Sequence, residues 1–506
     1  MVERGAFVTK ENRIYSLTDY ANMDIRASRL MSTSSAANNT ASRIKTFLSN
    51  PISNYTSIIT AMQSLYHTNG TFNRVINYYA SMPTYNYGIY PSPNAKNNFE
   101  LSGSLEEFLT VAEQIDKYEI KRYAPYFVKQ TLIQGMSFFY EISDGNGVVY
   151  MEFPPSMCII TGIENGVYRF GIDVSKLPDE IGELKGFPSE LVKAKQDGSS
   201  ANPDKWIEDT YYIVSNKGFA LTFDQSAIRN GGIGLPEHMS LLEDASLIES
   251  AKNNVAIKDK IDTVRLLSAK IPMDKDGNPK MNPKTAQKWN QVINASTPDG
   301  VGVFVTPLEV QSLNVAGTNN AAYTNLDGAQ RQMMTSAGTP SVLFGGDIKS
   351  AAILTMSVNK DASWMYNTVL PILEAYYNEV LSKIKTESGN SWKINIIKQN
   401  IYSRKDDISY YKDAVTLGGS RTDYLASIGY TPMESYAKLN MEQDMLKIDE
   451  LMKPKPTSYT MSGTETNETI AGQTVNPEDE PQENNEPGEA GRIEEEEPSE
   501  ETERQQ

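Results

Sequence analysis

Apolar residues recur at helical spacing through much of the N-terminal part of the chain. Between residues 55 and 79 this spacing is interrupted once, by Asn69 and Gly70, a pair that is typical of a turn. The pattern therefore predicts two helices joined by a turn. A further helical stretch is predicted over residues 105–135.

Short apolar runs follow and predict strands. The runs FFYEIS and GVVYMEF flank the turn sequence DGNG, which predicts a hairpin over residues 138–150. Further strands are predicted at residues 158–161, 168–172, 211–214 and 219–223. Short strands on a helical base predict an α+β region that ends near residue 235.

Residues 236–267 have an apolar residue every three or four positions beneath a charged face. They predict an amphipathic helix about 40 Å long or somewhat more, at 1.5 Å per residue. A short mixed insert follows, with strand-like SAKIPM, a helix over 283–295 that starts after the N-cap Asn282, and strands GVGVFV and LEVQSL. A second helix over 319–338 completes a predicted helical hairpin with an insert at its tip.

The segment TPSVLFGGDIKS, with two consecutive glycines, predicts a loop before a third helical stretch over 351–385. Pro371 lies inside this stretch and predicts a kink, because proline removes one backbone hydrogen bond. A strand at 392–397 and helices at 406–417, 422–428 and 433–451 are predicted to follow.

The two ends of the chain differ from the rest in composition. The Ser-, Asn- and Ala-rich residues 1–49 predict a flexible arm, and the charged, Pro-rich residues 453–506 predict a disordered tail. Residues 457–506 contain 15 acidic and 2 basic side chains, so they carry −13 of the net charge of −17. The nearly neutral remainder argues against a basic clamp that grips DNA by neutralising its phosphates, but not against a conduit in which DNA slides.

The sequence offers little for catalysis or metal binding. Cys158 is the only cysteine, and His67 and His238 are the only histidines, which excludes a Cys/His zinc cluster. No GxxxxGKS/T, GxSxG or HExxH motif is present, so we expect no cofactor, no metal and no enzymatic activity. A nuclease with metal-binding carboxylates stays open, because scattered acidic residues can converge. No apolar run approaches the roughly 18 residues of a membrane span.

Five tyrosines cluster in the segment YYASMPTYNYGIYP: Tyr78, Tyr79, Tyr85, Tyr87 and Tyr90. Stacking on the bases of a single-stranded nucleic acid is one use of such a cluster. Because few basic residues accompany these tyrosines, we expect them to lie in the core or at a contact between subunits.

The order of these parts resembles the portal proteins of tailed bacteriophages, the rings that connect head and tail, in the branch of the SPP1-like portals. The resemblance spans residues 55–452 and lies in architecture and spacing more than in identity. Its most specific segment is LFGGDIKSAAIL, which is similar to the passage from the tunnel loop of these portals into a long helix.

The resemblance implies a portal fold within the α+β class. Its parts would be a flexible arm at 1–49, an α/β wing at 50–235, a stem helix at 236–266, a small α/β clip at 267–316, a second stem helix at 317–338, a tunnel loop at 339–350, a kinked wing helix and strand at 351–399, a helical crown at 400–452 and a disordered acidic tail at 453–506.

The resemblance also implies a non-enzymatic ring subunit, in twelve copies, at one capsid vertex of the virion, through which double-stranded DNA is packaged and ejected. Its partners would be other copies of the chain, the major capsid protein, the terminase, and neck or tail proteins. A DNA-facing role carries over only to the tunnel-loop residues Gly345, Gly346, Asp347, Ile348, Lys349 and Ser350. Lys349 is the candidate for keeping the duplex centred, and an ordinary solvated loop charge is the alternative.

Two further questions stay open at this point. The acidic tail is either a solubility tail, or an arm that binds a basic scaffold or core protein or shields the ring from premature contact with DNA. The alternative function for the whole chain is another structural component of the virion, a capsid or baseplate protein.

Overall fold

The structure is a computed structural model, and the residues that it describes are 6–8, 14–16, 41–92, 104–143, 147–179, 186–263, 265–270, 274, 281, 282, 284, 285, 287, 288, 291, 292, 301–306, 321–339, 351–384 and 391–448. The chain divides into one unit of residues Met1–Met445 and a second of residues Leu446–Gln506. All helices and strands named below lie in the first unit. Their strands, most of which pair antiparallel, form sheets packed with helices, so the fold class is α+β, as predicted.

The largest sheet among the described residues has seven strands. The strands are β4 (Met136–Ser143), β5 (Val148–Phe153), β6 (Cys158–Glu164), β7 (Val167–Asp173), β8 (Trp206–Ile207), β9 (Tyr211–Ile213) and β10 (Gly218–Thr222). Their order is β5-β4-β10-β7-β9-β8, with β6 on β7, and every pair is antiparallel. The predicted hairpin is β4–β5, and the four further predicted strands are β6, β7, β9 and β10.

Both faces of this sheet are covered. Side chains alternate between the two faces along each strand, so neighbouring residues belong to different core clusters. Phe139 and Phe219 belong to the main core cluster, and Phe138 and Phe170 belong to a second cluster on the other face. The main cluster contains residues of α3 (Tyr55–Thr68), α4 (Gly70–Ser81), α5 (Ser104–Asp116), α6 (Ile120–Gln134) and α13 (Leu370–Ser382). The second contains Leu191 of α8 (Ser189–Asp197).

Short 3-10 turns connect the strands and helices of this region. They are η1 (Pro155–Met157), η2 (Val174–Lys176), η3 (Ser199–Ala201) and η4 (Pro203–Lys205). Asp173 caps η2, because its side-chain oxygen accepts a hydrogen bond from the Ser175 N–H at 3.1 Å.

The predicted turn at Asn69 and Gly70 separates α3 from α4. Asn69 is the N-cap of α4, and its side-chain oxygen accepts hydrogen bonds from the backbone N–H groups of Thr71 and Phe72, both at 3.0 Å. A helix start leaves four N–H groups without helical partners, and this cap satisfies two of them. The pattern of apolar residues and the cap therefore agree on where α4 begins.

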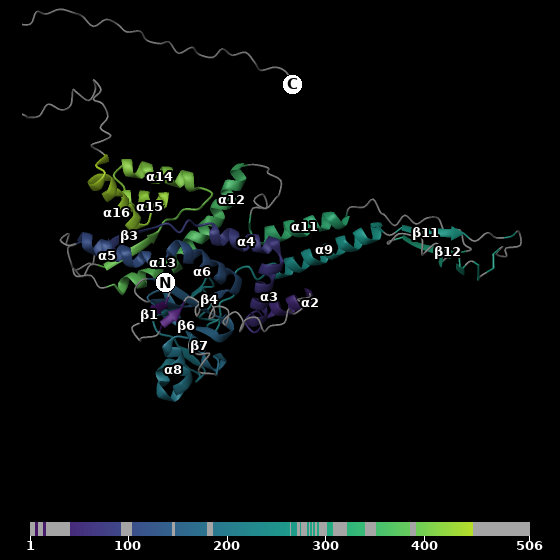
Figure 1. The fold of residues 1–506 in the computed structure, drawn as a ribbon, viewed down its shortest axis with the longest axis horizontal. Coiled ribbons are helices and arrows are strands. Elements are labelled where there is room, and N and C mark those ends of the chain that lie inside the picture. The colour runs from purple at the N-terminus through teal and green to yellow at the C-terminus, as the bar shows by residue number, and fades with distance from the viewer. Residues whose placement is uncertain are drawn as a thin grey trace, which may run out of the picture. The chain divides into compact units, whose positions relative to one another are not determined.

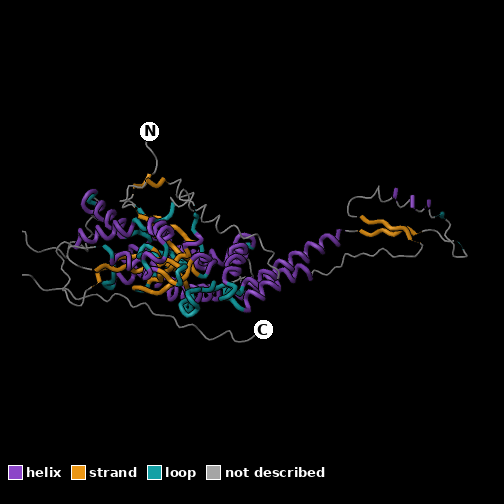
Figure 2. The backbone as a smooth tube through the Cα atoms, turned by 90° about the horizontal axis from the view of Figure 1, so that it is seen from below, coloured by secondary structure: helices purple, strands orange, loops and turns teal. Residues whose placement is uncertain are grey.

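The predicted helical hairpin is formed by α9 (Leu241–Thr263) and α11 (Ala321–Ser336), which lie side by side in both views (Figures 1 and 2). The first helix is shorter than predicted. It starts at Leu241 instead of residue 236, and residues 265–267 belong to strand β11 (Arg265–Lys270). The run Arg265, Leu266, Leu267 is compatible with either structure by its apolar pattern, and strand pairing decides the outcome.

The insert between α9 and α11 contains a parallel strand pair. β11 pairs with β12 (Val301–Thr306), with Arg265 opposite Val301 and Lys270 opposite Thr306. The strand predicted at GVGVFV is confirmed, and the one predicted at SAKIPM shares residues 268–270 with β11. The Asn282 side chain accepts a hydrogen bond from the Lys284 N–H at 3.1 Å, as expected of the predicted cap. Most of the predicted helix at 283–295 and the strand LEVQSL lie outside the described residues.

The predicted third helical stretch consists of α12 (Ala351–Trp364), the π-helical segment η6 (Met365–Val369) and α13. Pro371 is the second residue of α13, so the irregularity predicted at this proline takes the form of a π-helical turn just before it. Proline has no N–H group, and its ring clashes with the carbonyl four residues earlier. The wider π turn accommodates both effects.

The C-terminal helices follow close to their predicted positions. They are α14 (Arg404–Thr416), α15 (Arg421–Ile428) and α16 (Pro432–Asn440), after which η7 (Met441–Met445) is π-helical. The predicted strand is β13 (Ser391–Ile396), and it pairs antiparallel with β3 (Tyr87–Ser92). The predicted tail beyond residue 453 lies outside the described residues.

The N-terminal residues differ from the expectation of an arm without packed elements. Helix α2 (Ala41–Ser49) contacts α3 and α9, and its Ile44 is 3% exposed in the main core cluster. β1 (Ala6–Val8) pairs antiparallel with β2 (Ile14–Ser16). The sequence did not predict α2, because its surroundings are mostly polar and the helix packs through only a few apolar side chains. Within the described ranges, no helix is both long and apolar enough to cross a bilayer.

Candidate functional site

The residues predicted to face DNA are Gly345, Gly346, Asp347, Ile348, Lys349 and Ser350, and all six lie outside the described residues, which stop at 339 and resume at 351. The elements that border them are the end of α11 and the start of α12. The candidate site is therefore built from the hairpin of α9 and α11 and from the contacts at its base.

Side-chain contacts at the outer end show that the two helices of the hairpin are antiparallel. Tyr323, near the start of α11, donates its hydroxyl hydrogen bond to the carboxylate of Asp259, near the end of α9. The Lys258 Nζ lies 5.1 Å from the centroid of the Tyr323 ring, within reach of a cation–π contact. These contacts fix the register of the outer half, and the pattern of apolar residues had not predicted them.

The inner half of the hairpin belongs to the main core. In α9 the buried apolar residues are Leu241, Leu242, Ala245, Ile248 and Ala251, and in α11 they are Met333 and Met334. The amphipathic pattern predicted six residues on the apolar face, and three of them, Leu241, Ala245 and Ile248, are buried. Val255 is half-buried, and the side chains of Ile261 and Val264 lie outside those that the structure describes.

The outer half of the hairpin has little core of its own. No described side chain of α9 beyond Ala251 is buried. In this half Ile257 and Tyr323 are 54% and 46% exposed, and Leu247, on the inner half of α9, is 51% exposed. Full burial of a Leu or Ile side chain contributes about 1.5–3 kcal/mol, so a partner that covers Leu247 and Ile257 would gain about 2 kcal/mol from these two residues.

The described side chains of α9 and α11 carry a small negative charge. Five are acidic and three are basic, a net charge of −2: Glu243, Asp244, Glu249, Asp259 and Asp327 against Lys252, Lys258 and Arg331. Arg331 is paired with Asp327 at 2.9 Å on the same helix face. A surface of this charge repels phosphates weakly and does not hold them.

Buried aromatic residues hold the base of the hairpin. Tyr79 of α4 donates its hydroxyl to the carbonyl oxygen of Ala337, just after α11, at 3.2 Å. The ring of His238, three residues before α9, lies 5.1 Å from the ring of Tyr79. Burial lowers the pKa of His238 to about 4, and its Nε2 has no hydrogen-bond partner among the described residues. The imidazole is therefore neutral at pH 7.

The neighbouring Tyr78 connects the same helix to α12. Its hydroxyl donates to the Asp361 carboxylate at 2.9 Å, and both side chains are buried. Burial raises the pKa of Asp361, while the hydrogen bond from Tyr78 lowers it. The cluster of tyrosines was expected in the core or at a subunit contact: Tyr78, Tyr79, Tyr85 and Tyr87 are buried, and only Tyr90 is exposed, at 46%.

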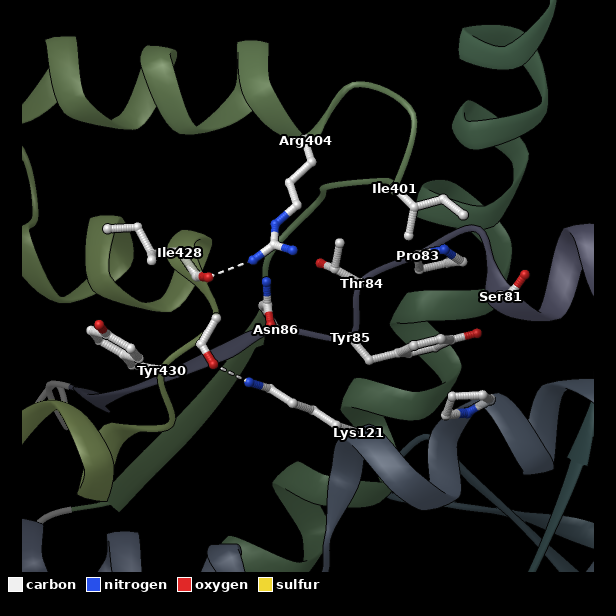
Figure 3. A pocket seen from close by; sticks show the side chains of 12 residues that line it. Ser81, Pro83, Thr84, Tyr85, Asn86, Lys121, Ile401, Arg404, Ile428 and Tyr430 are labelled. Carbon is white, nitrogen blue, oxygen red and sulfur yellow. Dashed lines mark hydrogen bonds between the residues drawn. The ribbon is translucent and has the colours of Figure 1, made fainter.

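A pocket of about 440 Å³ lies between residues 81–86, α6 and the C-terminal helices (Figure 3). Lys121 Nζ donates to the carbonyl oxygen of Gly429, and the Arg404 guanidinium donates to the carbonyl oxygen of Ile428 at 2.6 Å. Both cations thus sit at the C-terminal end of α15, where a helix carries a negative partial charge. Burial lowers the pKa of Lys121, whereas Glu434 nearby raises it. We assign this pocket to helix capping and not to ligand binding.

Cysteine chemistry and metal binding can be judged for the residues that the structure describes. Cys158 is 3% exposed, and burial raises the pKa of its thiol far above the usual value, which makes it unreactive. No group of three or more His, Cys, Asp or Glu side chains within the described ranges is placed to hold a metal ion.

No protein-family model matches the chain, and no curated protein matches it in sequence. Three similar solved chains come from gene transfer agent (GTA) particles, and each match covers 72% of this chain. A chain of the native GTA virion is 11% identical over 89% of its length, with a TM-score of 0.38. A chain of the empty-particle neck, computed with C6 symmetry, is 11% identical over 90%, with a TM-score of 0.40.

The third chain belongs to the neck of the native particle, computed with C12 symmetry. It is 10% identical over 89% of its length, with a TM-score of 0.38.

Proposed function

We propose that the chain is a portal protein of a tailed bacteriophage, a non-enzymatic subunit of a ring of about twelve copies at one capsid vertex. In this proposal α9 and α11 are the stem helices, and the residues between them form the clip. The observation that carries the proposal is the long antiparallel hairpin, which has strands β11 and β12 between its helices and leaves outer apolar side chains uncovered.

A ring accounts for the uncovered side chains. In a head-to-tail contact each subunit offers one surface and receives a different one, and repetition by rotation closes the ring without free edges. Leu247 and Ile257, each about half exposed, would then pack against the hairpin of the next copy. A helix pair with so little core of its own depends on such packing, because helices in water owe most of their stability to the burial of an apolar face.

The charge of the hairpin suits a passage for double-stranded DNA. A protein that grips DNA neutralises several phosphates with Lys and Arg, whereas α9 and α11 carry a net charge of −2 over their described side chains. DNA would slide past such a surface during packaging and ejection. Gly345, Gly346, Asp347, Ile348, Lys349 and Ser350 are proposed to face it. The major capsid protein, the terminase and neck or tail proteins are the proposed partners.

Ring formation tests the proposal directly. Purified protein is expected to form closed rings with an axial hole, seen by negative-stain electron microscopy and counted by native mass spectrometry. Replacing both Leu247 and Ile257 by Glu should leave a folded chain that does not assemble, because the contact would then bury two carboxylates.

Leu417 provides the matched control, since it is 89% exposed directly after α14, outside the hairpin, and Leu417→Glu makes the same kind of substitution. This variant should still form rings. A well-folded wild-type chain that stays monomeric under all conditions would contradict the portal assignment and favour another structural virion component. Cleavage of DNA in the presence of Mg²⁺ or Mn²⁺ would favour the nuclease alternative instead.

The role of Lys349 needs a test of its own. In a packaging reaction with assembled capsids, Lys349→Ala should lower the amount of DNA packaged severalfold if this lysine centres the duplex. Lys360, an exposed lysine of α12, gives the control Lys360→Ala, which should package normally. Equal packaging by the two variants would mean that Lys349 is an ordinary solvated loop charge.

A further inference from the structure

Two adjacent tyrosines of α4 contact the elements on both sides of residues 340–350. Neighbouring residues on a helix point about 100° apart, so Tyr78 and Tyr79 reach different partners. Both are buried, with 5% and 6% of their surface exposed, and their rings contact each other edge to face at 5.2 Å. They are thus parts of one rigid cluster.

Tyr79 contacts the base of the hairpin next to both of its helices, α9 and α11. Its hydroxyl donates to the carbonyl oxygen of Ala337 at 3.2 Å, beyond the last residue of α11. Its ring lies 5.1 Å from that of His238, which precedes α9. The same ring meets Trp364, the last residue of α12, edge to face at 5.7 Å. One side chain therefore contacts the entry to α9, the exit from α11 and the end of α12.

Tyr78 contacts α12 about one helical turn before Trp364. Its hydroxyl donates to the Asp361 carboxylate at 2.9 Å, and Asp361 is only 6% exposed. A buried carboxylate that loses its donor is left with an unsatisfied charge, so this hydrogen bond restricts where α12 can lie. In the printed sequence 23 positions separate Ala337 from Asp361, yet both are held by two consecutive residues of α4.

We infer that Tyr78 and Tyr79 form a single positioning site that couples the packing of the hairpin base to the packing of α12. A displacement at either side is passed on because both hydroxyl bonds start from the same helical turn and the two rings pack on each other. This coupling does not depend on ring formation or on DNA, so it can hold or fail independently of the proposed function.

Tyr→Phe variants isolate the two hydroxyl bonds, because they keep each ring in the core. Hydrogen exchange of the full chain, followed by mass spectrometry, measures local opening at residues 333–339 and in α12 separately. Tyr79→Phe is expected to speed exchange at both places by about fivefold, the lower end of typical couplings between sites. Tyr78→Phe should do the same from the other side, because coupling free energies are reciprocal.

Tyr366 supplies the matched control. It lies in η6 directly after α12, and its hydroxyl accepts a hydrogen bond from the Asn400 side chain at 3.1 Å, away from the hairpin. Tyr366→Phe should leave exchange at residues 333–339 unchanged. The inference is overturned if Tyr79→Phe affects only residues 333–339 and Tyr78→Phe only α12. It is equally overturned if Tyr366→Phe reproduces the pattern, because the effect is then a general loosening.

Discussion

His238 shows how burial fixes the charge of one side chain. The residue is 9% exposed, its Nε2 has no partner among the described residues, and burial lowers its pKa to about 4 from the ordinary 6.5. Protonation would place an unpaired charge between α9 and the Tyr79 ring. The folded chain therefore holds the neutral imidazole over a pH range in which the unfolded chain binds a proton.

This difference predicts a loss of stability in mild acid. Between pH 7 and pH 5 the His238 contribution to the free energy of unfolding should fall by about 2 kcal/mol, because only the unfolded state takes up the proton. Glu237 and Asp361 have raised pKa values and contribute the opposite slope, so the comparison must be made between variants. Urea unfolding of wild type and His238→Gln at both pH values measures it, and identical pH dependences would contradict it.

The ion pairs of Arg169 lead to a second prediction at the residue scale. It donates to Glu379 at 2.5 Å, to Glu164 at 3.0 Å and to the Gly218 carbonyl at 3.1 Å, and the Glu379 side chain is only 4% exposed. Arg169→Met should cost about 3–5 kcal/mol of unfolding free energy, because it leaves a buried carboxylate with Lys383 as its remaining cation at 3.3 Å.

The double variant Arg169→Met with Glu379→Leu is the control for this prediction. Removing both charges should recover much of the loss, since a buried pair replaced by apolar side chains is often nearly neutral in stability. Chemical denaturation of the wild type and the two variants measures these changes in unfolding free energy. If the double variant is less stable than Arg169→Met, Glu379 stabilises the fold through interactions other than its ion pair with Arg169.

At the residue scale, the sequence predicted which tyrosines are buried better than it predicted their hydrogen-bond partners. The few basic residues near the tyrosine cluster were enough to place Tyr78, Tyr79, Tyr85 and Tyr87 away from nucleic acid, and all four are buried. The hydroxyl partners of Tyr85 and Tyr87 lie 5 and 29 positions away, at Ala80 and Asp116. Those of Tyr78 and Tyr79 lie 283 and 258 positions away, at Asp361 and Ala337. Such pairs depend on the tertiary packing of α4 against α12, which no local pattern encodes.

Among the elements, α4 depends on its cap. Asn69 is 8% exposed and accepts hydrogen bonds from two N–H groups at the helix start. Asn69→Ala should lower the unfolding free energy by about 1–2 kcal/mol, whereas Asn69→Asp keeps an acceptor and should cost less. Thermal or urea unfolding distinguishes the two, and equal losses would mean that the cap is not what stabilises α4 here.

Element boundaries mark where sequence patterns reach their limit. Helical spacing placed α3, α4 and the C-terminal helices, because their apolar faces are regular. It predicted one helical stretch over residues 105–135, where the structure has α5 and α6, separated at Glu119, whose φ is 42°. It missed α2, whose contact with the core rests on a few apolar side chains, and it continued α9 into residues that pair with β12. The proline at 371 predicted a break, but whether a kink or a π turn results depends on how α13 packs.

At the scale of the whole molecule, most of the net negative charge lies in the C-terminal residues. Residues 457–506 carry −13 of the net −17. Under the portal proposal, deleting them should leave rings intact but reduce their incorporation into capsids, since attraction to a basic scaffold or core protein is lost. A full-length variant with tail Glu replaced by Gln separates charge from length. Unchanged incorporation by both variants would leave solubility as the role of the tail.

The candidate site was only partly accessible to sequence reasoning. The order of hairpin, insert and returning helix could be predicted, because helical periodicity and turn residues are local signals. The exposure of Leu247 and Ile257 could not, since the pattern cannot tell which apolar positions find cover within one chain. The assignment of DNA contacts to residues 345–350 stays a prediction.

The buried thiol of Cys158 has a practical consequence for a proposed ring. It is the only cysteine of the chain, and its 3% exposure and raised pKa keep it from reacting with maleimides. A cysteine introduced at the exposed Lys252 or Asn253 would therefore take up one dye per subunit, with no native residue to remove. Counting the photobleaching steps of single labelled particles would then give the number of subunits in each assembly.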